Sequence, residues 1–255
     1  MSAAYRVRAR NTASGSENKI HDDRVAARYG FRGGLVPGVT VYGYMTVPVV
    51  AEFGRAWLEF GSMQVRFQQP FHVGEEVVVR RYGDRVTAER EDGSVCATGV
   101  LTLAATPAHA GICAEHPLPA GRPLASWDSL APGTPLGTLH EKVNLADHAF
   151  LELRGERLPL YKGPDAVAHP ALLLGFANQI LVRNFELGPW IHTASGLTNH
   201  GLARHGEEIS VRGRIHDRFE RKGHEFVVLD VALVAAGGRL VQTARHTAIY
   251  RPRTG

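Results

Sequence analysis

The sequence predicts an α+β fold of two tandem repeats, each a long apolar helix wrapped by an antiparallel sheet. Three observations lead to this prediction. Two long, nearly uncharged segments have the length of helices, and each is followed by alternating segments with hairpin turns. The two sets are separated by a nearly constant offset along the chain. With 255 residues, 44% of them apolar, the chain can bury such a core.

The first half begins with two predicted helices. The stretch "HDDRVAARYG" predicts a short helix, because Asp22 or Asp23 suits the N-cap and Gly30 suits the position just beyond the end. Residues 38–54 form a long, almost uncharged segment, which indicates a buried helix. Pro48 lies inside it and is expected to kink that helix or to end it early.

The strands of the first half follow this helix. Residues 62–68 alternate between apolar and polar side chains, which is typical of a half-buried strand. Residues 74–81 lead into a second strand. Residues 89–104 form a predicted hairpin around the dipeptide Asp92-Gly93, a strong short turn signal.

The second half repeats this order. Residues 168–188 predict a second apolar helix, with Pro170 in its first turn and Gly188 closing it. The segment 205–215 resembles the strand that follows the first helix, and residues 224–250 predict a hairpin around two glycines, Gly237 and Gly238.

The offset between the halves indicates an internal duplication. Pro37 and Pro170 are 133 positions apart, and Gly74 and Gly206 are 132 positions apart. We therefore expect an N-terminal repeat at 1–104, a linker rich in proline, alanine and glycine at 105–137, and a C-terminal repeat at 138–255. The repeats are expected to join edge to edge, which would cover otherwise exposed strands.

Composition narrows the function classes. Only Cys96 and Cys113 are present, with no CxxC spacing, which favours a reducing compartment and argues against a structural zinc site. The start "MSAAYRVRARN" lacks an apolar leader region, and no stretch approaches the length of a membrane span, so we expect a soluble cytoplasmic protein with no membrane partner. The net charge is +4, but the basic residues are dispersed, which disfavours nucleic acid and suits a small anionic ligand.

The stretch "GSENKIHDD" (15–23) carries the candidate chemistry. Together with the glycine-rich loop "RGGLVPG" and the duplicated scaffold, it resembles the motif of the MaoC-like, (R)-specific enoyl-CoA hydratases, which are double hotdog proteins. The resemblance covers the whole chain at the level of architecture, while its specific motif lies within the first 45 residues. It implies a double hotdog fold and an acyl-thioester hydratase or dehydratase, a lyase of fatty acid metabolism.

The resemblance also implies a set of catalytic residues. His21 matches the family's histidine, which acts with an aspartate five residues earlier to activate water, and Asn18 matches the asparagine that shapes the turn. The aspartate's position is occupied here by Ser16, whose hydroxyl cannot take up a proton at neutral pH. Three alternatives remain open: Glu17 reaches the site, His21 acts alone as general base, or Ser16 orients water.

The start of the long helix is the second part of the predicted site. Gly38 opens this helix, so its N–H is unpaired within the helix and carries the positive end of the dipole. Such a donor can stabilise an enolate-like oxygen, as the family's glycine does. Two plainer interpretations stay open: Gly38 only permits close packing, and His21 is a surface histidine beside a helix start. The candidate substrate-binding residues are Arg32, Gly34, Val36 and Tyr42.

Other histidines are given structural roles. His192, His200 and His205 are expected to face solvent, and no metal site is predicted. His169, at the point expected to match Val36, is predicted to contact the start of the second helix. No cofactor is implied apart from coenzyme A as part of the substrate, and the expected partners are acyl-CoA or an acyl-carrier protein, with a homodimer as the candidate assembly.

Two further functions remain open. The first is a catalytically silent acyl-CoA-binding protein or subunit, which the serine at position 16 favours. The second is an acyl-CoA thioesterase, in which a carboxylate on the buried helix directs water at the thioester carbonyl. Glu52 is the only acid within 38–54 and lies near its far end, which disfavours this chemistry.

Overall fold

The computed structural model describes residues 4–106, 111–146 and 149–253. The remaining positions lie outside the described residues. They belong to the start of the predicted N-terminal repeat, to the predicted linker and to the predicted C-terminal repeat.

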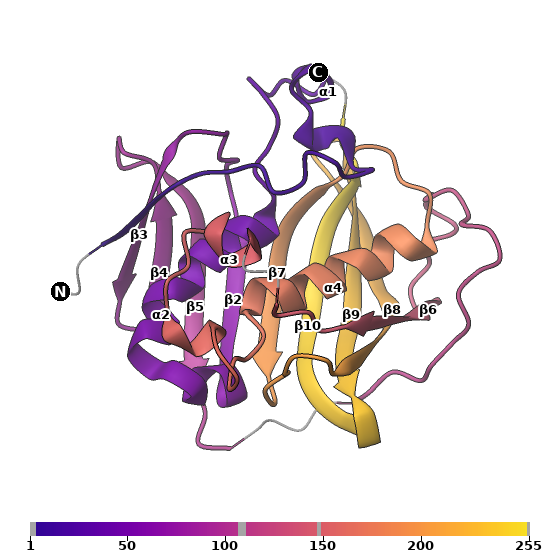
Figure 1. The fold of residues 1–255 in the computed structure, drawn as a ribbon. Helices are drawn as coiled ribbons and strands as arrows, with labels where there is room; N and C mark the ends of the chain where they lie inside the picture. The colour runs from indigo at the N-terminus through magenta and orange to yellow at the C-terminus, as the bar shows by residue number, and fades with distance from the viewer. Residues whose placement is uncertain (1–3, 107–110, 147–148, 254–255) are drawn as a thin grey trace.

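The described strands form one antiparallel sheet, in the order β1-β3-β4-β5-β2-β7-β10-β9-β8-β6 (Figure 1). From one edge inward the order is β1-β3-β4-β5-β2, and from the other edge inward it is β6-β8-β9-β10-β7. The strands of the two repeats are therefore arranged in the same way, which makes the duplication visible in the topology. The strands are β1 (Tyr5–Arg8), β2 (Gly61–Phe67), β3 (Glu76–Tyr82), β4 (Arg85–Glu89), β5 (Val95–Leu103), β6 (Pro135–Lys142), β7 (Ile191–Asn199), β8 (Glu208–Arg221), β9 (His224–Ala235) and β10 (Arg239–Arg251).

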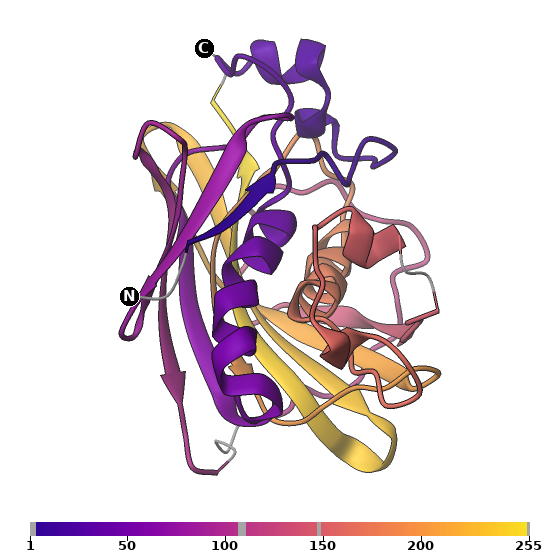
Figure 2. The same ribbon diagram turned by 60° about the vertical axis from the view of Figure 1, so that its left-hand side comes forward.

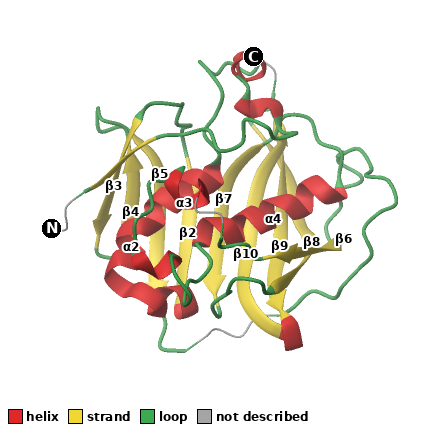
Figure 3. Cartoon of the chain, viewed as in Figure 1, coloured by secondary structure: helices red, strands yellow, loops and turns green. Residues whose placement is uncertain are grey.

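Two long helices lie on the same side of the curved sheet (Figure 2). They contact each other, and each packs on the strands of its own repeat. The helices are α1 (Asp23–Ala27), α2 (Gly38–Phe60), α3 (Ala149–Glu152) and α4 (Pro170–Asn184), with 3-10 turns η1 (Lys19–His21), η2 (Pro159–Tyr161) and η3 (Ala236–Gly238). In the face-on view of Figure 3 the two long helices cross in front of the strands, as expected for an α+β fold with apolar faces buried between helices and sheet.

The first long helix extends further than predicted. Its first two turns are almost wholly buried, as the uncharged sequence indicates. Pro48 does not end it, and the helix continues to Phe60. The backbone leaves helical geometry at Gly54 instead, where φ is 56°, because glycine adopts a left-handed conformation without steric cost. The expectation of an early end at Pro48 is therefore wrong, and the break in helical geometry lies at Gly54.

The hairpins are confirmed, and some boundaries differ. Gly93 and Gly237 both have positive φ at the predicted turns. The side chain of Asp22 caps α1, as the sequence predicts. The second long helix ends at Asn184 rather than near Gly188, because the chain then turns into β7.

The two repeats join through β2 and β7, which pair antiparallel from Ser62 opposite Thr198 to Arg66 opposite Ala194. This confirms the predicted edge-to-edge junction. In the chain's described part, no helix is both long and apolar enough to cross a membrane.

Candidate active site

A cavity of about 610 Å³ lies between the start of α2 and the middle of α4. Both repeats contribute to its wall. The first repeat supplies residues of the motif and the helix start, and the second supplies one face of α4 and the start of β7. The residues of this wall used below are Ser16, Glu17, Asn18, His21, Val36, Gly38, Val39, Phe67, Arg154, Arg183 and His192.

His21 is held as a neutral base. Its Nδ1 lies 2.7 Å from the carbonyl oxygen of Leu35, which only accepts, so Nδ1 carries the proton. The second nitrogen, Nε2, is unprotonated and accepts a long hydrogen bond of 3.4 Å from Nδ2 of Asn18. Burial lowers the pKa of the His21 imidazole, and the hydrogen bond to Leu35 opposes that shift. The ring is therefore neutral at pH 7, as a general base must be.

The turn before His21 is built by two short polar side chains. Ser16 Oγ accepts the N–H of Asn18 at 3.0 Å, and Asn18 Oδ1 accepts the N–H of Ile20 at 3.3 Å. Such local bonds are typical of the caps and turns that serine and asparagine favour. Ile20 is 1% exposed and packs in a small apolar cluster with Leu35, which anchors the turn and with it the imidazole.

Asn18 also fastens the motif to the second repeat. Its Nδ2 donates to the carbonyl of Trp190 at 2.9 Å, and its Oδ1 accepts the N–H of the same residue at 3.1 Å. Asn18 is buried, so these bonds have little competition from water. Trp190 immediately precedes β7, and the cavity wall is therefore closed by a contact between the repeats.

The start of α2 presents unpaired N–H donors to the cavity. Pro37 occupies the N-cap and provides no side-chain cap, and its carbonyl accepts from Thr40 and Val41. Among the described residues, none accepts a hydrogen bond from the N–H of Gly38 or Val39. Both residues line the cavity. An oxygen with developing negative charge is favoured at such a helix start.

The second repeat has no equivalent of the histidine. The N–H of Leu35 donates to the carbonyl of Ile20, and the N–H of Val167 donates to the carbonyl of Leu160 in the matching position. Tyr161, which follows Leu160, therefore takes the histidine's place. Its ring is buried, and its hydroxyl has no partner among the described residues.

The start of the second long helix is closed. Pro170 is its first residue and has no N–H, and His169 at the N-cap accepts the N–H of Ala171 at 3.0 Å. His169 therefore contacts the helix start as predicted, but it matches Pro37 and not Val36. Of the two long helices, both within the described residues, α2 has free N–H donors beside the cavity and α4 does not.

Glu17 lies at the rim of the cavity. Its carboxylate is 2.9 Å from Arg122 in the predicted linker, and its side chain is 72% exposed. The alternative in which Glu17 replaces the missing aspartate has no support in this arrangement, because the carboxylate is directed toward the arginine and solvent.

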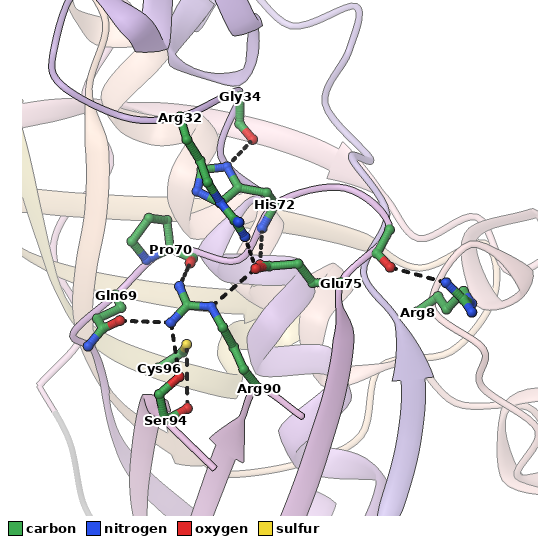
Figure 4. Close-up of polar contacts among 11 residues, drawn as sticks. Arg8, Arg32, Gly34, Gln69, Pro70, His72, Glu75, Arg90, Ser94 and Cys96 are labelled. Carbon is green, nitrogen blue, oxygen red and sulfur yellow. Dashed lines mark hydrogen bonds and ion pairs between the residues drawn. The ribbon is translucent and has the colours of Figure 1, made fainter. Parts of the chain in front are cut away.

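Three of the four predicted substrate-binding residues, Arg32, Gly34 and Tyr42, lie outside the cavity wall. Arg32 forms an ion pair with Glu75, which Arg90 also contacts at 3.2 Å, and the Arg32 side chain is 63% exposed (Figure 4). Tyr42 lies on α2 and is fully buried in the hydrophobic core. Val36, in contrast, does line the cavity.

Gly34 supports the site from behind. A Cβ at this position would lie 2.2 Å from the carbonyl oxygen of His21, so only glycine lets the loop pass this close. Its N–H donates to Asp23 at 2.7 Å, and its carbonyl accepts from His72 (Figure 4). Gly34 was predicted to bind substrate, and the structure instead places it behind His21, outside the cavity wall.

His192 was predicted to face solvent, and this is wrong. The residue is 7% exposed and lines the cavity. Its Nε2 lies 2.8 Å from Ser195 Oγ, which is 3.0 Å from Nδ1 of His246. A bulge opposite Thr247 shifts the register of β7 and turns His192 to the same face as Ser195. That bulge arises from strand pairing, and the alternation of the sequence carries no signal of it.

His192 is a neutral polar group. Burial, with a contribution from the neighbouring His246, lowers the pKa of His192 well below its usual value. Its Nδ1 is buried without a hydrogen-bond partner in the part of the chain that the structure describes. The described residues contain no cluster of three or more histidine, cysteine or acidic side chains that could hold a metal ion.

No protein-family model matches the sequence, and no curated protein is similar to it in sequence. Solved structures share its fold. A protein assigned as a MaoC domain dehydratase from Chloroflexus aurantiacus is 10% identical over 99% of this chain and 96% of its own, with a TM-score of 0.65. A conserved hypothetical protein from Mycobacterium tuberculosis, described as a double hotdog fold, is 14% identical over 98% and 96%, with a TM-score of 0.61.

A third similar structure belongs to another activity class. A protein assigned as an oleoyl thioesterase from Lactobacillus plantarum is 11% identical over 98% of both chains, with a TM-score of 0.52. The fold is therefore shared by proteins of different named activities, and it does not choose between them. The chain has the double hotdog fold, with two tandem repeats whose sheets join into one.

Proposed function

We propose that the protein hydrates 2-enoyl thioesters, or dehydrates the corresponding 3-hydroxyacyl thioesters, in the cavity between its two repeats. One observation carries this proposal. The lone pair of His21 Nε2 and the free N–H donors at the start of α2 belong to residues of the same cavity wall. Hydration needs these two functions together: a base for water and donors for the oxygen that becomes negative.

The reaction follows from these two groups. His21 Nε2 takes a proton from water while the water oxygen bonds to C3 of the enoyl group. The electron pair of the C2–C3 double bond forms a C1–C2 double bond, and the carbonyl pair moves to the thioester oxygen, which the N–H of Gly38 stabilises. The His21 imidazolium then gives its proton to C2, and the neutral ring is restored. Dehydration is the reverse of these steps, with the same groups in the opposite roles.

The serine at position 16 leads us to expect a slow rate of hydration. A hydroxyl does not take up a proton at neutral pH, so His21 is the only basic group of the motif that serves the cavity. General base catalysis contributes about 10²- to 10⁴-fold, so a site with one base is expected to turn over slowly rather than not at all. The carrier is coenzyme A or an acyl-carrier protein.

A series of enoyl thioesters tests the proposal. Crotonyl-CoA and longer 2-enoyl-CoAs are incubated with the protein, and loss of enoyl absorbance and release of free thiol are followed in parallel. Loss of absorbance without thiol is the expected result. Release of thiol indicates thioester hydrolysis instead. That chemistry has little support here, because Glu52 is exposed and forms an ion pair with Arg81.

The second candidate is a silent acyl-thioester-binding protein. It is favoured by Ser16, whose hydroxyl is already used to accept the N–H of Asn18. Tight binding of enoyl-CoA with no conversion at any chain length would support this function and end the hydratase proposal.

A further inference from the structure

A buried arginine forms part of the cavity wall without a carboxylate partner. Arg154 follows α3 in the chain and is 7% exposed. Its Nη1 donates to the carbonyl of Phe150 at 2.9 Å, and its guanidinium carbon lies 3.7 Å from the centre of the Phe150 ring. These contacts hold the guanidinium in place, but neither of them neutralises its charge.

Within the described residues, no aspartate or glutamate oxygen lies within ion-pair distance of Arg154. Its Nε is buried and has no acceptor. The nearest acid in sequence, Glu156, is engaged elsewhere. One oxygen lies 3.4 Å from His169, and the other accepts the N–H groups of Arg157 and Leu158.

The charge on Arg154 persists at neutral pH. Burial lowers the pKa of its guanidinium to about 10, which still leaves the group protonated at pH 7. Burying an unpaired charge is costly, so buried charges in proteins are normally paired. A permanently charged guanidinium with unused donors in a cavity wall therefore favours an anion inside that cavity.

The position of Arg154 defines where that anion would lie. A Cβ at Gly43 would be 3.4 Å from Arg154 Cδ. Gly43 follows Gly38 by five residues, which corresponds to about 7.5 Å along the helix. The Arg154 side chain thus passes α2 beyond its free N–H donors, about one and a half turns further along the helix. Measured between its two terminal oxygens, an extended acyl group of four or five carbons with a far carboxylate spans about 6–7 Å, which is close to this offset.

We propose that Arg154 binds the far carboxylate of a short dicarboxylic acyl group whose other end is the thioester. This inference rests on the proposed function for the thioester end, which it places at Gly38. A phosphate of the carrier is the less suitable anion, because it would have to be buried. Arg183 lines the same cavity and is exposed, so the surface already offers a cation to the carrier.

Equilibrium binding of two thioesters tests this inference without requiring turnover. Succinyl-CoA and butyryl-CoA have the same carrier and four-carbon acyl groups, and only succinyl-CoA has a far carboxylate. Isothermal titration calorimetry is expected to show tighter binding of succinyl-CoA by the wild type, by at least about tenfold, as hydrogen bonds to charged groups provide. In Arg154→Met this preference is expected to disappear.

Arg183→Met is the matched control. It removes an exposed arginine of the same cavity and is expected to weaken both ligands alike, leaving their ratio unchanged. Equal affinity of the wild type for the two thioesters would overturn the inference, as would a preference that persists in Arg154→Met. A carrier phosphate as the true partner would appear as equal weakening of both ligands by Arg154→Met, which also overturns it.

Thermal unfolding separates binding from a structural role. Removal of an unpaired buried charge is not expected to lower the unfolding midpoint, whereas loss of a structural arginine would lower it and leave the ligand ratio unchanged. If Arg154→Met does not fold, Arg154→Lys keeps the charge without the planar fork, and the preference should fall but remain above one. A succinyl preference without hydration of any enoyl-CoA refutes the proposed function alone, and hydration without the preference refutes this inference alone.

Discussion

The start of α2 and the imidazole of His192 fit together because residue 38 has no side chain. A Cβ at this position would lie 2.8 Å from His192 Nδ1 and 3.2 Å from Cε2 of Phe67. Both rings belong to the cavity wall. The helix donors and the histidine of the second repeat therefore share one tightly packed corner.

Gly38→Ala tests this corner. The substitution keeps the backbone N–H but forces the helix start or the two rings to move. Because misplacement of about 1 Å can cost about 10²-fold in rate, kcat for enoyl-CoA hydration is expected to fall by about that factor. Gly188→Ala is the control, since a Cβ there meets nothing within 4 Å. Equal kcat values for the two variants would contradict the account.

Ser16→Asp restores the carboxylate of the family pattern. An aspartate can still accept the N–H of Asn18, as Ser16 Oγ does at 3.0 Å, so the turn should be kept. A second proton acceptor in the cavity is expected to raise kcat by about tenfold or more, within the range of general base catalysis. Steady-state kinetics of Ser16→Asp and the uncharged Ser16→Asn measure this. A gain in both variants would show that the charge is not the cause.

Asn18→Ala is expected to loosen the junction between the repeats. It removes the two bonds to Trp190 and leaves buried backbone groups unpaired, so the free energy of unfolding should fall by about 1–3 kcal/mol. Urea unfolding gives the value. Asn144→Ala removes an exposed asparagine that caps a local turn and should change stability by less than about 0.5 kcal/mol. If Asn18→Ala is as stable as this control, the bonds to Trp190 do not hold the site.

The buried histidines predict a loss of stability in acid. Burial lowers the pKa of His246 from 6.5 to about 4. Between these values the unfolded chain binds more protons than the folded chain, so the free energy of unfolding falls as pH falls below 6.5. The loss of unfolding free energy due to His246 amounts to about 3 kcal/mol and is complete only below about pH 4.

His246→Asn isolates this contribution. The difference in unfolding free energy between wild type and variant is measured by urea unfolding at pH 7 and at pH 4.5, so that the effects of groups outside the His192–His246 pair cancel. The variant should lose less stability on acidification than the wild type. Parallel pH dependence in the two proteins would show that His246 does not titrate on unfolding.

The elements with strong local signals were predictable from the sequence. Local sequence determines the hairpin turns at Gly93 and Gly237, the helix cap at Asp22 and the buried helix that begins at Gly38. The end of α2 was not predictable from the sequence, because the helix continues past Pro48 and, after a break in helical geometry at Gly54, extends to Phe60.

The candidate site also has one part that the sequence indicates and another part that it does not. The motif around His21 is contiguous, so its spacing could be recognised. Arg154 and His192 come from the other repeat, and no local pattern indicates that they line a cavity. His192 depends on a bulge between β7 and β10, and Arg154 on how the segment after α3 packs against Gly43. Long-range pairing decides both.

The most direct test of the account is the rate of enoyl-CoA hydration by wild type and by His21→Ala, measured side by side with unfolding curves of both proteins. The wild type is expected to hydrate enoyl-CoA, and His21→Ala is expected to lower that rate by at least about 10²-fold while it remains folded. Equal rates in the two folded proteins would contradict it, because the reaction would then need no proton acceptor at position 21.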